Sequence, residues 1–204
     1  MTTTPSRTLR DVVGLDSEPP RLSESALVLI DYQNTYLTGV MALEGADAAV
    51  KAGARLLARA RAAGIPVVHI VNDGGENTPY DIRAHIGALI DEVAPVDGEP
   101  VVVKQFPDAF HATTLEQTLR DLGVRPDGHL VLAGFMTHMC VAFTAQGAFR
   151  HGYRPTVVAE TAATRPLAAP DGTVLPAADL HAAALTTVTD LFGTVVATVD
   201  ALRD

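Results

Sequence analysis

The sequence contains a single cysteine among its 204 residues, so no disulfide can form within the chain. A cysteine-rich cage for a metal ion is excluded for the same reason. Cys140 is therefore either a small buried apolar side chain or a reactive thiol. Composition alone leaves both roles open.

Long hydrophobic runs are also absent. The apolar stretches are short ones such as Ala26–Ile30, whereas a membrane-spanning helix needs about 20 apolar residues. The first residues, MTTTPSRTLRD, lack the apolar core of a secretory signal. We therefore expect no membrane partner and a cytoplasmic location.

Positive charge is scarce, because the formal net charge is -9 and the pI is about 5.1. A protein that binds nucleic acid needs a basic face to neutralise phosphates, so we expect no nucleic-acid partner. Only Lys51 and Lys104 are lysines among the fifteen cationic residues. Arginine is thus the usual cation of this chain, and a lysine at a given position is a specific choice.

From Ala26 onward, short apolar runs alternate with longer segments of helical period, which is typical of strands buried on both faces and joined by helical crossovers. The pattern predicts a single α/β domain over residues 26–204: a three-layer α/β/α, Rossmann-like, open and mostly parallel six-stranded sheet. Residues 1–25, rich in Thr, Ser, Pro and charge, are expected to form an arm over the domain or over a partner subunit.

The expected strands are Ala26–Ile30, Val67–Val71, Val101–Val103, Leu130–Ala133, Thr156–Ala159 and Thr194–Val199. The expected helices are Ala46–Ala63, Pro79–Glu92, one that ends at Gly123, Thr137–Gly152 and Ala177–Leu191. Thr113 and Glu116 have the spacing of a capping box for the third of these helices.

Ligands of open parallel sheets bind outside the carboxyl ends of the strands, so polar residues that directly follow a strand are candidates for a site. Five expected strands are followed by such residues: Asp31 to Gln33, Asn72 to Gly75, Lys104 and Gln105, the segment from Gly134 to Cys140, and Glu160. Three of these groups bring a carboxylate, an ammonium and a thiol to one edge of one sheet.

A thiol with a pKa near 8.5 is mostly protonated at neutral pH, so a nucleophilic cysteine needs a base and a positive charge nearby. Asp31 can be the base, and Lys104 can stabilise the thiolate. The predicted position of Cys140, in the first turn of a helix, adds the positive end of the helix dipole and free backbone amides for an oxyanion. Taken singly, each residue has an ordinary alternative role: packing for the thiol, a turn for Asp31 and a solvated cation for Lys104.

Further side chains are expected to line the substrate pocket. They follow the strands that carry the trio or lie in the turn before the thiol: Gln33, Tyr36, Asn72, Phe110 and His138. The alternatives are core packing for the aromatic rings and a solvent-facing position for His138. The histidines lack the spacing of a metal site, and no glycine-rich phosphate or dinucleotide loop is present.

Three segments resemble the isochorismatase-like cysteine hydrolase superfamily: VLIDYQNTY around Asp31, VVVKQFPDAF around Lys104 and LVLAGFMTHMCV around Cys140. The resemblance covers nearly the whole chain from Ala26. It implies that Cys140 attacks an amide carbonyl to form a thioester, that Asp31 moves protons and that Lys104 lowers the thiol pKa. It also implies a cis peptide bond between Phe135 and Met136, which aims the Met136 and Cys140 amides at the oxyanion.

Two features narrow what the resemblance implies. Nicotinamidases hold a metal with histidines after the second strand, where this chain has Asn72-Asp73-Gly74-Gly75, so we expect neither a metal nor a cofactor. Isochorismate-cleaving members can lack the cysteine, so Cys140 favours hydrolysis of a C-N bond in a small amide or lactam, as in the streptothricin-hydrolase-like branch. A vinyl-ether hydrolase with Asp31 as acid and a non-catalytic binding module are the alternatives. The resemblance further implies a homodimer or higher homo-oligomer.

Overall fold

The computed structural model describes residues 4–204, so the first three residues of the expected arm lie outside the described residues. Six strands form one sheet in the order β3-β2-β1-β4-β5-β8, and every pair of neighbours is parallel. The strands are β1 (Ser25–Ile30), β2 (Val67–Asn72), β3 (Val101–Lys104), β4 (His129–Phe135), β5 (Arg154–Ala163) and β8 (Thr194–Val196). The predicted fold class is confirmed.

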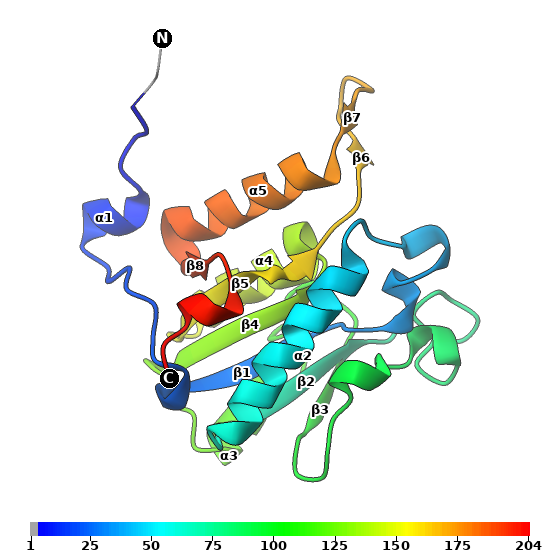
Figure 1. Ribbon diagram of the computed structural model, residues 1–204, viewed down its shortest axis with the longest axis horizontal. Helices are drawn as coiled ribbons and strands as arrows, with labels where there is room; N and C mark the ends of the chain where they lie inside the picture. The colour runs from blue at the N-terminus through cyan, green and yellow to red at the C-terminus, as the bar shows by residue number, and fades with distance from the viewer. Residues whose placement is uncertain (1–3) are drawn as a thin grey trace.

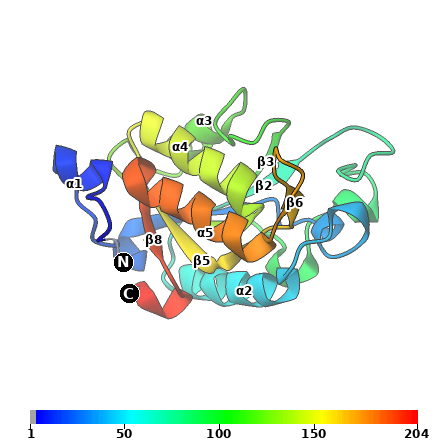
Figure 2. The ribbon, with the colours of Figure 1, turned by 90° about the horizontal axis from the view of Figure 1, so that it is seen from above.

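Helices cover both faces of the sheet, which gives three layers (Figures 1 and 2). On one face lies α2 (Ala46–Ala62), whose buried Leu56 and Leu57 pack with Leu27 and Leu29 of β1. On the other face lie α3 (Leu115–Asp121), α4 (Ala142–Arg150) and α5 (Ala177–Thr187). The alternating side chains of each strand thus enter two separate cores.

The strand order sets where a ligand can bind. It runs one way from β1 through β2 to β3 and the other way from β1 through β4 to β8. The switch point therefore lies between β1 and β4, where the connections leave toward opposite sides and open a crevice at the carboxyl ends. Asp31 follows β1 and Cys140 follows β4, so both residues border this crevice.

Residues 79–92 were predicted to be helical, and this prediction is wrong. Only two short 3-10 turns form there, His85–Gly87 and Asp91–Val93. The Asp81 carboxylate accepts the backbone N-H groups of Asn77 and Arg83 at 2.9 and 3.0 Å, which favours turns over an α-helix.

The predicted capping box is also wrong. The Thr113 hydroxyl accepts the Leu115 amide at 3.1 Å, two residues on, rather than the amide of the third. Glu116 turns away to Arg120 and His151. The helix α3 still ends before Gly123, which has a left-handed φ of 82°.

The N-terminal segment forms the short helix α1 (Leu9–Val13) before it enters the core. Leu22 is completely buried, and Arg21 pairs with Arg203 in an isolated parallel bridge, so the segment that leads into β1 lies beside the C-terminal segment. A two-stranded antiparallel hairpin, β6 (Leu167–Ala168) and β7 (Val174–Leu175), projects between β5 and α5 (Figure 1). None of the helices formed by residues 4–204 has the length and hydropathy to cross a bilayer.

Candidate active site

Asp31 is the first residue after β1 and has a left-handed φ of 51°. Its amide donates to the carbonyl of Ile70 at 3.0 Å, and its own carbonyl accepts the amide of Gln33 at 2.7 Å. The side chain is completely buried. The chain therefore leaves the sheet at Asp31 with the carboxylate held inside the crevice.

Lys104 is the last residue of β3 and is only 1% exposed. Its Nζ lies 2.7 Å from Asp31 Oδ2, 3.2 Å from Cys140 Sγ and 3.3 Å from Asn72 Oδ1. The carboxylate, the ammonium and the thiol expected from three separate strand ends thus converge on one point. β2 lies between β1 and β3 and contributes Asn72 to the same cluster.

Cys140 lies in a turn of π-helix, Thr137–Val141, and not in the first turn of an α-helix as predicted. The amides of Met139 and Val141 both donate to the Met136 carbonyl, at 3.1 and 3.2 Å, which widens this turn before α4 begins at Ala142. The thiol is 7% exposed. The peptide bond between Phe135 and Met136, which leads into the turn, is cis.

Gly134 allows β4 to approach β1 just before this turn. Its φ is 130°, and a Cβ atom at this position would lie 1.9 Å from the Ile30 carbonyl oxygen. Such contacts do not occur between real atoms, so only glycine fits. The close approach brings the residues that follow β4 against those that follow β1.

Burial dominates the electrostatics of the cluster. It raises the pKa of the Cys140 thiol to about 12, an effect that the Asp31 charge strengthens and Lys104 only partly opposes. Burial likewise raises the pKa of Asp31 above its ordinary value, against the opposing charge of Lys104. Burial acts to lower the pKa of Lys104, but Asp31 and Cys140 outweigh it and hold that pKa above its usual range.

Burial therefore favours the neutral thiol, whereas the 2.7 Å contact favours the charged forms of Asp31 and Lys104. Lys104 does act to lower the thiol pKa, as expected, but burial and the Asp31 charge outweigh it. Asp31 Oδ1 has no hydrogen-bond partner within residues 4–204, so it is free to accept a proton. The arrangement can transfer the thiol proton to Asp31 when the sulfur attacks.

Gln33 and Asn72 join the ends of β1 and β2. The Gln33 amide nitrogen donates to the carbonyls of Asn72 and Gly87 at 3.0 and 2.7 Å, and its oxygen accepts the Asn72 amide at 3.0 Å. Because every polar atom of this completely buried side chain bonds to the backbone, Gln33 holds the backbone around the site in place. The Asn72 side chain is the one of the two that contacts Lys104.

Aromatic rings form one wall of the candidate active site. Tyr36 packs edge-on against Phe135 and against Tyr80, with ring centroids 5.5 and 5.8 Å apart. The pKa values of Tyr36 and Tyr80 are both raised, chiefly by burial and further by the nearby charge of Asp31. Tyr80 was missed in the sequence because it falls in the segment that was expected to be helical.

A second set of polar side chains lies near the end of β5. His138 Nδ1 is 2.6 Å from the Thr164 hydroxyl, and its pKa is lowered by burial and by the charge of Arg165. The charge of Arg165 also acts to lower the pKa of Tyr80, so it lies within electrostatic reach of both His138 and Tyr80. Its Nε has no hydrogen-bond partner within the described part of the chain.

Arg165 was missed because β5 was expected to end at Ala159. The strand is longer, with an irregular register opposite β4 between Leu132 and Gly134. Glu160, which the shorter strand made a candidate, binds Arg55 and the Val199 amide instead. The rule that polar residues follow strand ends would have found Thr164 and Arg165 if the bulge had been visible in the sequence.

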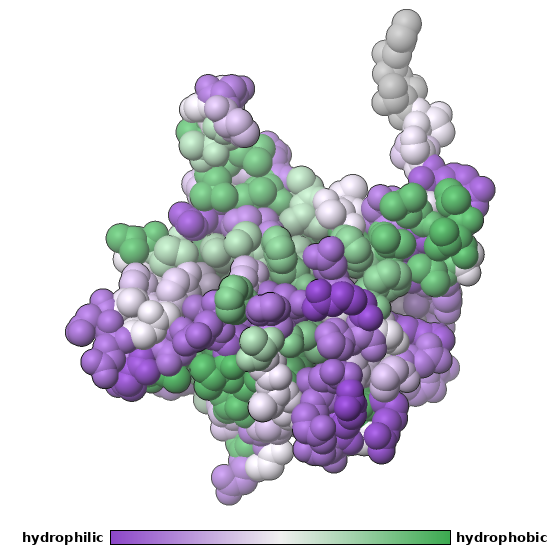
Figure 3. Space-filling model, turned by 180° about the vertical axis from the view of Figure 1, so that it is seen from behind, coloured by the Kyte–Doolittle hydropathy of each residue, from purple (hydrophilic) through white to green (hydrophobic). Residues whose placement is uncertain are grey.

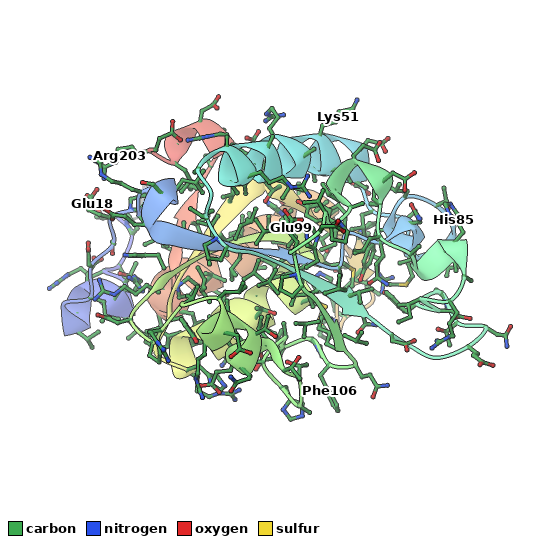
Figure 4. The ribbon with its side chains drawn as sticks, turned by 90° about the horizontal axis from the view of Figure 1, so that it is seen from below. Glu18, Lys51, His85, Glu99, Phe106 and Arg203 are labelled. Carbon is green, nitrogen blue, oxygen red and sulfur yellow. The ribbon has the colours of Figure 1, made fainter. Side chains whose placement is uncertain are left out.

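Phe110 and the nearby Phe106 stay outside the cluster. Phe110 stacks on His151 and Tyr153, at the far end of α4 from Cys140. Phe106 is 51% exposed and packs edge-on against His111, and Figure 4 shows it pointing away from the body of the protein. The described residues bring no three His, Cys, Asp or Glu side chains together as a metal site, and Asp73 pairs with Arg83.

Comparison with known proteins gives one family. The model of the isochorismatase domain matches residues 25–200, which is most of the chain. A solved structure described as an isochorismatase from Pseudomonas putida KT2440 superimposes with a TM-score of 0.91, at 38% identity, over 98% of this chain and 100% of the other.

Three curated relatives have names that indicate different activities or roles. A secreted isochorismatase effector of Verticillium dahliae is 31% identical over 94% of this chain and 97% of its own. A maleamate amidohydrolase of Pseudomonas putida is 32% identical over 87% and 85%. A streptothricin hydrolase of Streptomyces noursei is 35% identical over 72% of this chain and 57% of its own.

Proposed function

The chain belongs to the isochorismatase family of hydrolases, and from this premise we propose that it hydrolyses a C-N bond of a small amide with Cys140 as the nucleophile. The observation that carries the proposal is the contact of one buried ammonium with both partners. Lys104 Nζ lies 2.7 Å from the Asp31 carboxylate and 3.2 Å from the Cys140 sulfur. Such an arrangement holds a base and a nucleophile together before any substrate arrives.

The first half of the reaction forms a thioester. Asp31 takes the thiol proton while Sγ of Cys140 bonds to the amide carbonyl carbon, and the carbonyl electrons move to the oxygen. The backbone N-H groups of Met136 and Cys140 are proposed to bind this oxyanion. When the carbonyl re-forms, the C-N bond breaks, and the departing nitrogen takes the proton from Asp31.

The second half consumes water. Asp31, ionised again, accepts a proton from a water molecule that attacks the thioester carbonyl. The C-S bond then breaks, the sulfur recovers its proton from Asp31 and the carboxylic acid leaves. Lys104 stays protonated throughout, because its raised pKa keeps the charge that stabilises each anionic state of this dry site.

Arg165 favours a substrate that carries a carboxylate. This half-buried residue acts electrostatically on His138 and Tyr80, and its Nε lacks a partner within residues 4–204. A substrate carboxylate would supply the missing acceptor, since guanidinium and carboxylate match in geometry and charge. The amide of a small dicarboxylic acid, as in the name of the maleamate amidohydrolase, is thus the first substrate class to test. A small lactam is the second, after the streptothricin hydrolase relative.

Vinyl-ether hydrolysis is the second candidate function. Burial raises the pKa of Asp31, which helps this carboxyl to carry the proton that such a reaction needs, and the secreted relative is named an isochorismatase effector. In that reaction Cys140 would have no covalent role. A non-catalytic binding module is a weaker alternative, because it would not need three buried ionisable side chains in contact.

Both candidates are tested by assaying ammonia release from maleamate, ring opening of small lactams to the amino acid, and pyruvate release from isochorismate. We expect amide hydrolysis that Cys140→Ser and Asp31→Asn abolish, with an acyl adduct on Cys140 that hydroxylamine removes. Asp47→Asn, on the exposed face of α2, is the matched control and should keep full activity. If Cys140→Ala kept full activity, a thioester mechanism would be ruled out and the vinyl-ether reaction favoured. The expected cytoplasmic location stays a prediction.

A further inference from the structure

The turn that carries Cys140 depends on contacts outside its own backbone. It is π-helical from Thr137 to Val141. The amides of Met139 and Val141 share one acceptor, the Met136 carbonyl. Such wide turns are rare, and they occur mostly as single turns at functional sites. Because one carbonyl serves two amides, the backbone fixes this turn less firmly than an α-helix would, and side chains from neighbouring elements can supply the rest.

Two consecutive residues of the turn form side-chain hydrogen bonds to other elements. Thr137 Oγ1 lies 2.8 Å from His181 Nδ1 of α5, and His138 Nδ1 lies 2.6 Å from the hydroxyl of Thr164. Thr137 is completely buried and Thr164 is 2% exposed, so both hydrogen bonds are shielded from water. The turn is thus fastened to α5 by its first residue and to the end of β5 by its second.

His181 lies on the inner face of α5. Ala177 and Leu185, four residues before and after it, are both buried, and residues four apart share one face of a helix. Leu185 packs in the same core as Cys140. The helix lies beside α4 on this face of the sheet (Figure 2), and its outer side is uncovered between the hairpin and α1 (Figure 3). Its inner contacts therefore determine where α5 lies.

The imidazole of His181 is suited to a hydrogen bond without charge. Burial lowers its pKa, so the ring is neutral at neutral pH. A neutral imidazole has one nitrogen that donates and one that accepts. It can therefore bond to the Thr137 hydroxyl without adding a positive charge next to the turn that holds the thiol.

We propose that His181 is a positioning residue, which acts through Thr137 to hold the turn so that Cys140 Sγ keeps its place 3.2 Å from Lys104 Nζ. The inference rests on the proposed role of Cys140 as the nucleophile. A displacement of about 1 Å between reacting groups can lower a rate about 100-fold. Because His181 acts on the reacting atom and not on the substrate, it should affect kcat and not KM.

Kinetics of His181 variants on the amide that the wild type hydrolyses test the proposal. His181→Ala should lower kcat at least about tenfold and leave KM within about twofold. His181→Asn should recover most of this loss, because its amide group reaches the place of Nδ1 and can donate or accept. His181→Gln, whose amide group lies one bond farther out, should not. Thr186→Ala removes an exposed hydrogen bond to the Ala182 carbonyl within α5 and is the control.

Thr137→Val removes the other partner with little change of shape, so it keeps the test valid if His181→Ala does not fold. It should lower kcat as much as His181→Ala does. The double variant should be no slower than either single variant, because the same hydrogen bond is lost only once. An unchanged kcat in the single variants, additive losses in the double variant, or a His181→Asn protein as slow as His181→Ala would overturn the proposal.

Hydrogen exchange measured by mass spectrometry tests the same link without a substrate. In folded His181→Ala, the peptide that covers residues 136–142 should exchange at least about tenfold faster than in the wild type, while β1 keeps its slow exchange. Thermal unfolding shows that the variant is folded. Faster exchange in a protein that hydrolyses no amide would contradict the proposed function and still support the link from α5 to the turn. Unchanged exchange would contradict the link, whichever substrate is found.

Discussion

Asp31 and Lys104 form an ion pair that is closed to water, with 2.7 Å between Oδ2 and Nζ and with both side chains at 0% exposure. Neither side chain would be stable here as a charge without its partner, because an isolated buried ion is far less stable than a hydrated one. The pair is therefore a requirement of the fold as well as a part of the proposed mechanism.

Lys104→Met should lower the free energy of unfolding by about 3–5 kcal/mol, because it leaves the Asp31 carboxylate buried without a partner. The double variant Asp31→Asn/Lys104→Met should recover much of this loss, although it stays inactive. Urea unfolding of the two variants and the wild type measures the effect. Equal stabilities for the single and double variants would mean that the two charges are not coupled.

The Cys140 thiol should react slowly with iodoacetamide at pH 7 and faster only in strongly alkaline solution, because burial and the Asp31 charge raise its pKa to about 12. Asp31→Asn removes the second of these causes, so it should increase the labelling rate at pH 8 while activity is lost. Labelling in urea counts the total thiol in each sample. A wild-type thiol that titrates near neutral pH would contradict this account.

Arg165→Met should raise KM for an amide that carries a carboxylate much more than it lowers kcat, and should hardly affect a neutral amide of the same size. The reason is that the guanidinium is proposed to bind the distant carboxylate and not the reacting atoms. Arg150→Met removes an exposed arginine that pairs with Asp108, and serves as the control. The same loss for both substrates would assign Arg165 a structural role.

Glu99 should stabilise the protein in a pH-dependent way. Burial acts against its charge, but hydrogen bonds from Arg61 and His69 outweigh burial and lower the pKa of this carboxyl to about 2. The Glu99 side chain is 9% exposed, whereas Lys51 of α2 projects outward in Figure 4. A depressed carboxyl pKa gives stability that is present above the unfolded value of about 4.5 and is lost as the pH falls toward 2.

Glu99→Gln should therefore cost about 1–3 kcal/mol at pH 7, and this difference should shrink steadily below pH 4. The exposed Glu92 gives the matched control, since Glu92→Gln should stay within about 0.5 kcal/mol of the wild type. Denaturation at several pH values compares the variants. A difference that grows in acid would have the wrong sign for this pairing.

Gly134→Ala should prevent the native site from forming, with a loss of at least about 4 kcal/mol, because its methyl group would overlap the Ile30 carbonyl. Gly14 also has a left-handed φ, 73°, but faces open space. Gly14→Ala should thus cost only about 1–2 kcal/mol. Thermal unfolding and activity assays of both variants separate the cost of the backbone conformation from the cost of the steric overlap.

The sheet could be predicted because its strands are buried on both faces and are therefore continuous apolar runs. Val28, Leu132 and Val157 each lie in such a run and are completely buried. The three charged or reactive residues could be predicted because each lies at the end of a strand or shortly after it, and the strand ends of a parallel sheet share one edge. These inferences depend only on local patterns.

The parts that were not predicted depend on distant contacts. The backbone of residues 79–92 forms hydrogen bonds with distant residues; for example, the Gln33 side chain donates to the Gly87 carbonyl. These residues therefore do not form a helix, although their sequence has a helical period. Arg165 was hidden by the extra length of β5, which follows from its pairing with β4 and not from its own sequence. The thiol pKa could not be predicted because it depends on the depth of the crevice.

The hydrogen bond between the Thr137 hydroxyl and His181 Nδ1, at 2.8 Å, joins the turn that carries Cys140 to α5. A displacement of α5 therefore also moves the turn that holds the thiol. The position of Cys140 thus depends on a helix that follows it by almost forty residues in the sequence.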